Sequence, residues 1–265
     1  MMTEMTQSGT AIIKVSGLHK KFGNAHILKG IDLDVNSGEV VVIMGPSGAG
    51  KSTFLRCLNF LDEPSAGTIE ICGLKVDAKE SSGQRNKNIQ KIRRQAAMVF
   101  QDFNLFPHMT VLENITRGAV AVKKVPKAQA NAKAQALLDR YGLWERRNDF
   151  PARLAVGAQQ QVAIARSLCM EPQVILFDDP TSSLDPTLVR DLVATIAGLA
   201  EDGMTMIIVT NEPYLARSVA SRVILLDDGQ WQEIAPPEEF FTHPQKERTR
   251  QFLEHISLKD VSSEE

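Results

Sequence analysis

A short glycine-rich segment has the residue types and spacing that bind nucleotide phosphates. It fits the pattern GxxxxGK[ST] and consists of Gly45, Pro46, Ser47, Gly48, Ala49, Gly50, Lys51, Ser52 and Thr53. Glycines let backbone N–H groups turn inward around a phosphate, and a helix that begins here adds its dipole. Lys51 would reach the β- and γ-phosphates, and the Ser52 hydroxyl would bind Mg²⁺. A flexible loop that matches by accident is the alternative interpretation.

The residues on both sides of this segment favour phosphate binding. Residues 40–44 (VVVIM) form a compact β-branched run, which predicts a buried strand. After the segment, apolar residues recur with helical spacing at Phe54, Leu55, Leu58 and Leu61. A strand before the loop and a helix after it form the setting in which this pattern binds nucleotides.

A second run supplies a candidate magnesium ligand. Residues 174–177 (VILF) predict another buried strand, and Asp178 follows it directly. A carboxylate at this position lies beside the phosphate loop and can hold the Mg²⁺ shell. Many strands end in aspartate, so the signal comes from its pairing with the phosphate loop.

The elements that must position these residues predict an α/β fold with a largely parallel sheet. Further buried strands are expected at residues 206–209 and 223–226. A helix between the strands is indicated by the spacing of Val189, Leu192, Val193, Ile196 and Ala200. Residues 12–15 and 31–35 have a more alternating pattern, which indicates an N-terminal antiparallel part.

The middle of the chain predicts a helical insertion. Residues 102–171 contain no convincing strand, and Pro126 opens a helix that stops at Gly142. Its apolar stripe consists of Ala134, Leu137, Leu138 and Tyr141. We expect one domain over residues 1–265, with an α/β core at 11–101 and 172–258, a helical subdomain at 102–171, a polar loop at 78–88, and tails at 1–10 and 259–265.

Composition excludes several classes of protein. The 265 residues carry 30 Lys+Arg against 32 Asp+Glu, a net charge of -2 that gives no field for gathering nucleic acid. The 3 cysteines are scattered and predict neither a disulfide framework nor a metal site. No apolar run approaches the ~20 residues of a membrane helix, and the polar first residues predict no signal peptide.

Several ordered motifs together resemble the ATP-binding subunits of ABC transporters, above all those that drive bacterial importers of polar amino acids. The resemblance covers nearly the whole chain. Besides the phosphate loop, the matching segments are LKGI at 28–31, VFQDFNLFPH at 99–108, QQQVAIAR at 159–166, DDPTSSLDP at 178–186, PPEEFF at 236–241 and RTR at 248–250.

This resemblance implies a P-loop ATPase whose two copies close head to tail around two ATP molecules with Mg²⁺. It implies that Phe22 stacks on adenine, although a core Phe at a strand end is the alternative. Gln101 matches the residue that touches the metal and the attacking water, and Asp185 matches the loop that signals across the dimer. The implied partners are a second copy, membrane permease subunits that meet the helical subdomain, and indirectly an extracytoplasmic solute-binding protein. The implied location is the cytoplasmic face of the cell membrane.

Two catalytic positions depart from the family pattern. Where the family has a glutamate that polarises water, this chain has Asp179, which is one methylene shorter. A misplacement of about 1 Å can lower a rate by on the order of 10²-fold. The family's switch histidine is Asn211, which can hydrogen-bond a phosphate or water but carries no charge. The alternative role for Asn211 is the N-cap of the helix that follows it.

The third departure lies in the loop that reaches the opposite subunit, which we name the signature loop. The family has Leu-Ser-Gly-Gly-Gln, and this chain has Leu154, Ala155, Val156, Gly157 and Ala158. Ala155 lacks the hydroxyl that would reach the γ-phosphate. Val156 replaces a glycine that should approach that phosphate, and a β-branched residue resists a positive φ. Gln161 also stands where an arginine is usual.

Two functions remain open on these residues. One is an ATPase that energises uptake of a polar amino acid, slowed by Asp179, Asn211, Ala155 and Val156. The other is a degenerate nucleotide-binding subunit with a regulatory or structural role. A chromosome or repair ATPase is disfavoured because no long coiled-coil insertion fits in 265 residues.

Overall fold

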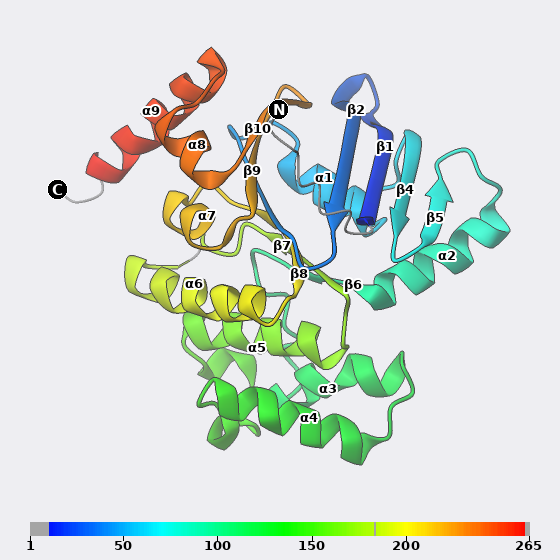
Figure 1. The fold of residues 1–265 in the computed structure, drawn as a ribbon. Coiled ribbons are helices and arrows are strands. Elements are labelled where there is room, and N and C mark those ends of the chain that lie inside the picture. The colour runs from blue at the N-terminus through cyan, green and yellow to red at the C-terminus, as the bar shows by residue number, and fades with distance from the viewer. Residues whose placement is uncertain (1–10, 183, 263–265) are drawn as a thin grey trace, which may run out of the picture.

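The computed structural model describes residues 11–182 and 184–262, whose elements are arranged around two β-sheets (Figure 1). The central sheet has the strand order β10-β9-β3-β8-β7-β6. Its neighbours pair in parallel except β9 and β10, which are antiparallel. The strands are β3 (Val40–Met44), β6 (Ala96–Val99), β7 (Val174–Asp178), β8 (Thr205–Val209), β9 (Arg222–Asp227) and β10 (Gln230–Ala235). The predicted parallel core is confirmed.

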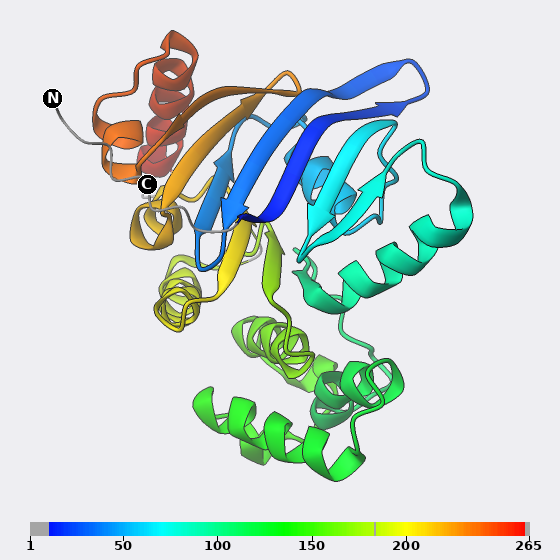
Figure 2. The ribbon, with the colours of Figure 1, turned by 45° about the vertical axis from the view of Figure 1, so that its right-hand side comes forward.

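A second, antiparallel sheet packs over one face of the first (Figure 2). Its order is β2-β1-β4-β5, and its strands are β1 (Ala11–Phe22), β2 (Ala25–Asn36), β4 (Ala66–Ile71) and β5 (Leu74–Asp77). The predicted strands at 12–15 and 31–35 lie within β1 and β2 and pair with each other. The antiparallel N-terminal part is therefore confirmed.

Alternation along the buried strands creates two cores, one on each face of the central sheet. On one face, Val41 and Ile43 of β3 pack with α1 (Lys51–Leu58) and the antiparallel sheet. On the other face, Val40 and Val42 pack with α6 (Pro186–Glu201), α7 (Pro213–Val219), α8 (Pro237–Thr242) and α9 (Glu247–Ser262). Because β3 is covered on both faces, the loop after it starts from a fixed point.

A helical region lies on the side of the central sheet away from the antiparallel sheet (Figures 1 and 2). It contains α3 (Val111–Ala121), α4 (Lys127–Arg140), α5 (Val156–Cys169) and two 3₁₀ turns, Trp144–Arg146 and Pro151–Arg153. Residues 102–171 hold no strand. As predicted, α4 starts after Pro126 and ends before Gly142, which has φ +66°. Its buried Ala134 and Leu138 face α3 and α5 in a separate apolar cluster.

Three sequence expectations need correction. The loop expected at residues 78–88 becomes helical from residue 82, as part of α2 (Ser82–Gln95), whose apolar contacts come late, at Ile89 and Ile92. Leu61 does not share the α1 face, because that helix ends at Leu58 and Phe60 turns to a positive φ of 54°. The tail expected from residue 259 is helical to residue 262 in α9. Residues 1–10 and 263–265 lie outside the described residues.

Among the residues that the structure describes, no helix combines the length and hydropathy of a membrane-spanning segment.

Candidate functional site

The phosphate loop is fixed by backbone contacts that only glycine permits. A Cβ at Gly45 (φ +151°) would lie 2.0 Å from the Leu226 carbonyl oxygen, so β9 directly supports the start of the loop. Gly50 (φ +103°) is the N-cap of α1, with no side-chain cap and no acidic residue in the first turn. The N–H groups of that turn are therefore left for an anion, as phosphate binding requires.

Lys51 folds back over its own loop. Its ammonium donates to the carbonyl oxygens of Gly45 at 2.6 Å and Pro46 at 3.0 Å. Burial lowers the pKa of Lys51, and the carboxylates of Asp179 and Asp178 act in the opposite direction. The lysine therefore lies at the mouth of the loop, close enough to both aspartates for their charges to act on it.

Asp178 is a buried carboxylate with spare coordination. It is 4% exposed, and its Oδ1 has no hydrogen-bond partner. Its Oδ2 lies 3.9 Å from the Nε of Arg56, which is half exposed. A buried, unsatisfied carboxylate oxygen is costly unless a ligand uses it, and oxygen donors suit Mg²⁺. The residues present therefore fit the metal.

The other expected metal ligands lie on neighbouring elements. Ser52 is in the first turn of α1, and Gln101 is exposed just after β6, the strand that pairs with β7. Among the described residues, no group of three or more His, Cys, Asp or Glu could hold a metal alone. Mg²⁺ is commonly bound by one or two carboxylates together with substrate phosphates, which suits Asp178 beside the phosphate loop.

Asp179 has a constrained backbone and a perturbed side chain. Its φ is +48°, its N–H donates to the Val209 carbonyl at 2.9 Å, and its own carbonyl accepts from the Ser182 hydroxyl at 3.1 Å. Burial raises the pKa of Asp179, with the Asp178 charge in the same direction and the Lys51 ammonium opposing it. A raised pKa makes a carboxylate a better proton acceptor, as a general base requires.

Asn211 binds the phosphate loop. Its Oδ1 accepts from the Gly45 N–H at 3.2 Å, a contact between residues far apart in the sequence. The alternative role as an N-cap is wrong, because Glu212 caps α7 and accepts from the Tyr214 N–H at 3.0 Å. The preceding Thr210 hydroxyl lies 3.1 Å from that of Thr181 and fixes the segment after β8.

Phe22 lies on the surface. It is 47% exposed at the end of β1, and the Lys20 ammonium lies 4.4 Å from the centroid of its ring. The alternative of a core phenylalanine is therefore wrong. A ring with a free face can stack on a planar base.

The signature loop makes its own local contacts at the start of α5. Among the described residues, no hydrogen bond or ion pair joins residues 154–158 to residues 45–53. Ala155 is the N-cap of α5 and supplies no side-chain cap. Val156 is the first residue of α5, has no positive φ and is 40% exposed, so the expected backbone strain is absent. Leu154 is buried, while Gly157 and Ala158 are partly buried in the first turn.

Two residues have local roles that the sequence did not indicate. Asp185 caps α6, and its Oδ1 accepts from the N–H groups of Thr187 at 2.9 Å and Leu188 at 3.1 Å. Arg166 of α5 donates to the carbonyls of Asn104 at 2.6 Å and Phe103 at 2.8 Å. Arg166 thereby fixes the segment that follows Gln101. The only sequence signal for this role was the position of Arg166 in the matching segment at 159–166.

The chain passes from β3 through the glycine-rich loop into α1, and Asp178 ends β7, which is separated from β3 by β8. This arrangement defines a P-loop nucleotide-binding fold. The family described as "ABC transporter" matches residues 28–182, and the chain belongs to this family. Subunits of this kind are ATPases. The resemblance found in the sequence is thereby confirmed.

Individual relatives cover almost the whole chain. A probable amino-acid ABC transporter ATP-binding protein of Haemophilus influenzae is 49% identical, over 92% of this chain and 95% of its own. The arginine transport ATP-binding protein ArtM of Bacillus subtilis is also 49% identical, over 92% and 100%. Among solved structures, cbiO1 of Clostridium perfringens has a TM-score of 0.77 at 30% identity, over 88% and 91% of the two chains. A dimeric bacterial ABC cassette has a TM-score of 0.74 at 34% identity, over 85% and 98%.

Proposed function

We propose that this chain is the ATP-binding subunit of an importer that couples ATP binding and hydrolysis to uptake of a polar amino acid. The amino-acid specificity rests on the relatives, whose names include amino-acid, L-cystine and arginine transport. The observation that carries ATP binding is the pairing of the supported phosphate loop with the unpartnered Asp178 oxygen.

In this proposal, the backbone N–H groups of residues 45–53 hold the phosphates, and Lys51 neutralises their charge. Ser52, Gln101 and Asp178 hold Mg²⁺, which when bound neutralises charge on the β- and γ-phosphate oxygens. Phe22 stacks on the adenine. The exposed position of the Phe22 ring supports this role, because an adenine base can reach the ring from solvent.

Asp179 accepts the proton of the attacking water, and burial favours that role. Asn211 accepts from Gly45 through its Oδ1 and keeps its amide hydrogens for water or phosphate. It stays neutral at every pH, so it adds no positive charge as a histidine could. Asp179 is one methylene shorter than the family's glutamate and Asn211 carries no charge, so we expect a slow hydrolytic step.

The proposed assembly is a dimer at the cytoplasmic face of the membrane. In it, the signature loop of each copy (Leu154, Ala155, Val156, Gly157 and Ala158) reaches the nucleotide held by the other copy. Asp185 lies beside that junction, and the helical subdomain (residues 102–171) meets the membrane permease, which works with an extracytoplasmic solute-binding protein. Ala155 and Val156 are exposed and so are accessible to a second copy, which supports action across a dimer.

Two measurements test the proposal, with Lys51→Ala as the control. Calorimetric titration should detect MgATP binding to the folded protein at millimolar ligand, and the variant should bind at least about 100-fold more weakly. Steady-state phosphate release should be slow and abolished in the variant. Absence of binding by the unmodified protein would refute the proposal. Binding without Lys51-dependent release would instead identify the degenerate subunit.

A further inference from the structure

The floor of the phosphate loop is the carboxyl end of β9. Gly45 lies against the Leu226 carbonyl oxygen, and Met44 is the register partner of Leu225. The backbone position of residues 225–227 therefore sets where the phosphate loop begins. Any group that fixes this end of β9 also acts on the loop.

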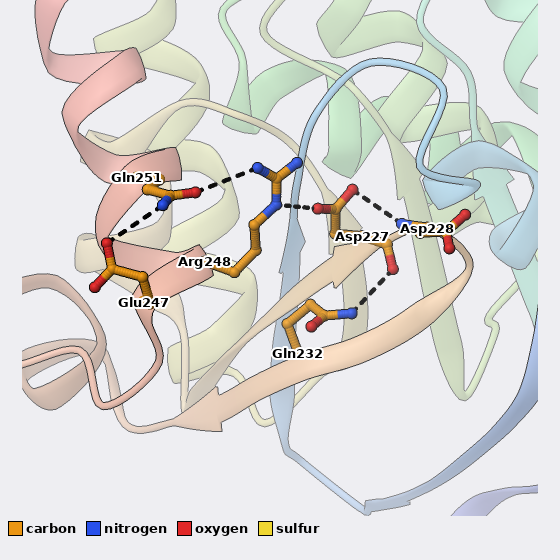
Figure 3. A network of polar contacts seen from close by, with 6 residues as sticks. All are labelled: Asp227, Asp228, Gln232, Glu247, Arg248 and Gln251. Carbon is orange, nitrogen blue, oxygen red and sulfur yellow. Dashed lines mark hydrogen bonds and ion pairs between the residues drawn. The ribbon is translucent and has the colours of Figure 1, made fainter.

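Asp227, the last residue of β9, adds side-chain contacts to the backbone pairing of β9 with β3 and β10 (Figure 3). One carboxylate oxygen accepts from the Asp228 N–H at 2.9 Å, and the other accepts from the Nε of Arg248. The backbone carbonyl of Asp227 accepts from the Gln232 side chain at 3.2 Å. Through Asp228, the same turn binds Lys29 of β2 at 2.5 Å.

Arg248 projects from a helix that is itself firmly held. Phe252 and Ile256 of α9 are buried in the core that contains β3, and Thr249 is completely buried. The buried Glu233 accepts from the N–H groups of Gln245 at 2.8 Å and Lys246 at 3.1 Å, just before α9 starts. Figure 3 shows Gln251 one turn further along α9, with its Oε1 3.5 Å from Arg248. The guanidinium is thus mounted on a rigid element.

A cavity of 240 Å³ separates α9 from the phosphate loop itself. Pro46 and Leu225 line one side, and Arg248, Phe252 and His255 line the other. Asp227 and Arg248 both line this cavity, and their ion pair is a polar link between α9 and the end of β9, beside the apolar packing of Phe252 in the core that contains Leu225. One substitution can remove this ion pair and leave the apolar packing in place.

We propose that Arg248 is a positioning residue of the nucleotide site, which acts through Asp227 and the end of β9 on the phosphate loop at Gly45. The inference rests on the proposed ATP binding. Loss of the ion pair loosens the floor of the loop and weakens nucleotide affinity, while the groups that perform hydrolysis remain in place.

The test compares Arg248→Gln with Arg250→Gln in the full chain. Arg250 is on the same helix, is similarly exposed and pairs with Glu247 at 2.8 Å, away from β9. We expect Arg248→Gln to raise the MgATP dissociation constant about fivefold, with KM raised and kcat unchanged. Arg250→Gln should stay within about twofold of the unmodified protein. Arg248→Lys, which keeps the charge, should recover part of the affinity.

Asp227→Asn removes the same ion pair from the other side and decides the matter if Arg248→Gln fails to fold. Thermal unfolding without nucleotide is measured for each variant, because a role limited to supporting α9 lowers the melting temperature and leaves affinity unchanged. Equal MgATP affinity in the folded variants and the unmodified protein would overturn the inference. If the unmodified protein binds no MgATP, the proposed function fails instead.

Discussion

The phosphate loop and the signature loop are held in opposite ways. The first lies on backbone from a distant strand, and both of its ends are fixed by contacts that only glycine and Lys51 can make. The second leads into the first turn of α5, where Ala155 and Val156 are exposed and the atoms nearest to a Cβ at Gly157 belong to the flexible Leu188 side chain. Ala155 and Val156, which are exposed, can therefore change without damage to the fold, whereas the phosphate loop tolerates little.

The largest effect is expected when one glycine is substituted in each loop and the losses of stability are compared. Gly45→Ala places a Cβ 2.0 Å from backbone and should destabilise the protein by about 3 kcal/mol and abolish MgATP binding. Gly157→Ala meets the movable Leu188 Cδ2 at 2.7 Å in a helical turn, so its effect should stay within about 1 kcal/mol. Denaturant unfolding and ATP titration measure both. Similar losses would show that the loops are equally constrained.

The second prediction concerns restoration of the family's groups. Asp179→Glu with Asn211→His repairs the side that binds ATP, and Ala155→Ser with Val156→Gly repairs the side that acts across the dimer. The full set should exceed either pair in phosphate release by at least about tenfold, or about 1.4 kcal/mol of barrier. The reason is that each nucleotide site of a homodimer uses both sets of groups, so a chain with only one pair repaired still lacks the other pair at both sites.

Dimerisation of the repaired variants is measured in parallel, because a change in assembly would also change the rate. Asp179→Glu and Asn211→His act on the same bound nucleotide, so their effects on the rate of phosphate release should be non-additive. If the unmodified chain already turns over as fast as the repaired one, the departures are harmless.

The third prediction uses the raised pKa of Asp179. In the interval between its ordinary and its raised pKa, the folded chain binds more protons than the unfolded chain, so the free energy of unfolding falls as pH rises. Above this interval the penalty persists in full. Asp179→Asn removes it and should raise the melting temperature most at pH 8, with a smaller gain toward acid pH, while phosphate release falls.

Asp139→Asn, an exposed change on α4, is the control for loss of a surface charge. Melting curves from pH 5 to pH 8 provide the measurement. A melting temperature that drops at pH 8 in Asp179→Asn would show that the Lys51 attraction outweighs burial.

The smallest effect is expected at an ion pair that joins the helical region to the α/β core. Arg140 of α4 pairs with Asp202 at the end of α6 at 3.1 Å, and both side chains are exposed. Arg140→Ala should therefore destabilise the protein by less than about 1 kcal/mol in denaturant titrations. A larger loss would mean that this pair, rather than apolar packing, holds the helical region to the core.

The sequence predicted those elements whose signal is local. The apolar runs at β3, β7, β8 and β9 could each be found because strands covered on both faces are continuously apolar. The helix α2 was missed because its first turns are polar and it is held by Arg93, which donates to the carbonyls of Asn59 and Phe60. Such contacts depend on tertiary structure and leave no periodic pattern.

The same limit applies to the site. The residue types of the phosphate loop and Asp178 follow from a motif, so their places could be predicted. The hydrogen bond from Gly45 to Asn211 could not, because it joins segments that meet only in the folded sheet. Nor does any local pattern show that Val156 starts a helix and so escapes strain.

The strand order also bears on how a newly made chain matures. β3 hydrogen-bonds to β8 on one side and β9 on the other, although both strands are synthesised much later. The phosphate-binding motif therefore leaves the ribosome long before its neighbours exist, and non-local pairing of this kind is slow to form. We expect arrested chains that end at residue 201 to contain the whole motif and yet retain no ATP, whereas chains extended past β10 acquire it. For most of its synthesis the nascent protein thus has a phosphate-binding motif without the strands that support it, which favours late binding of nucleotide over early binding.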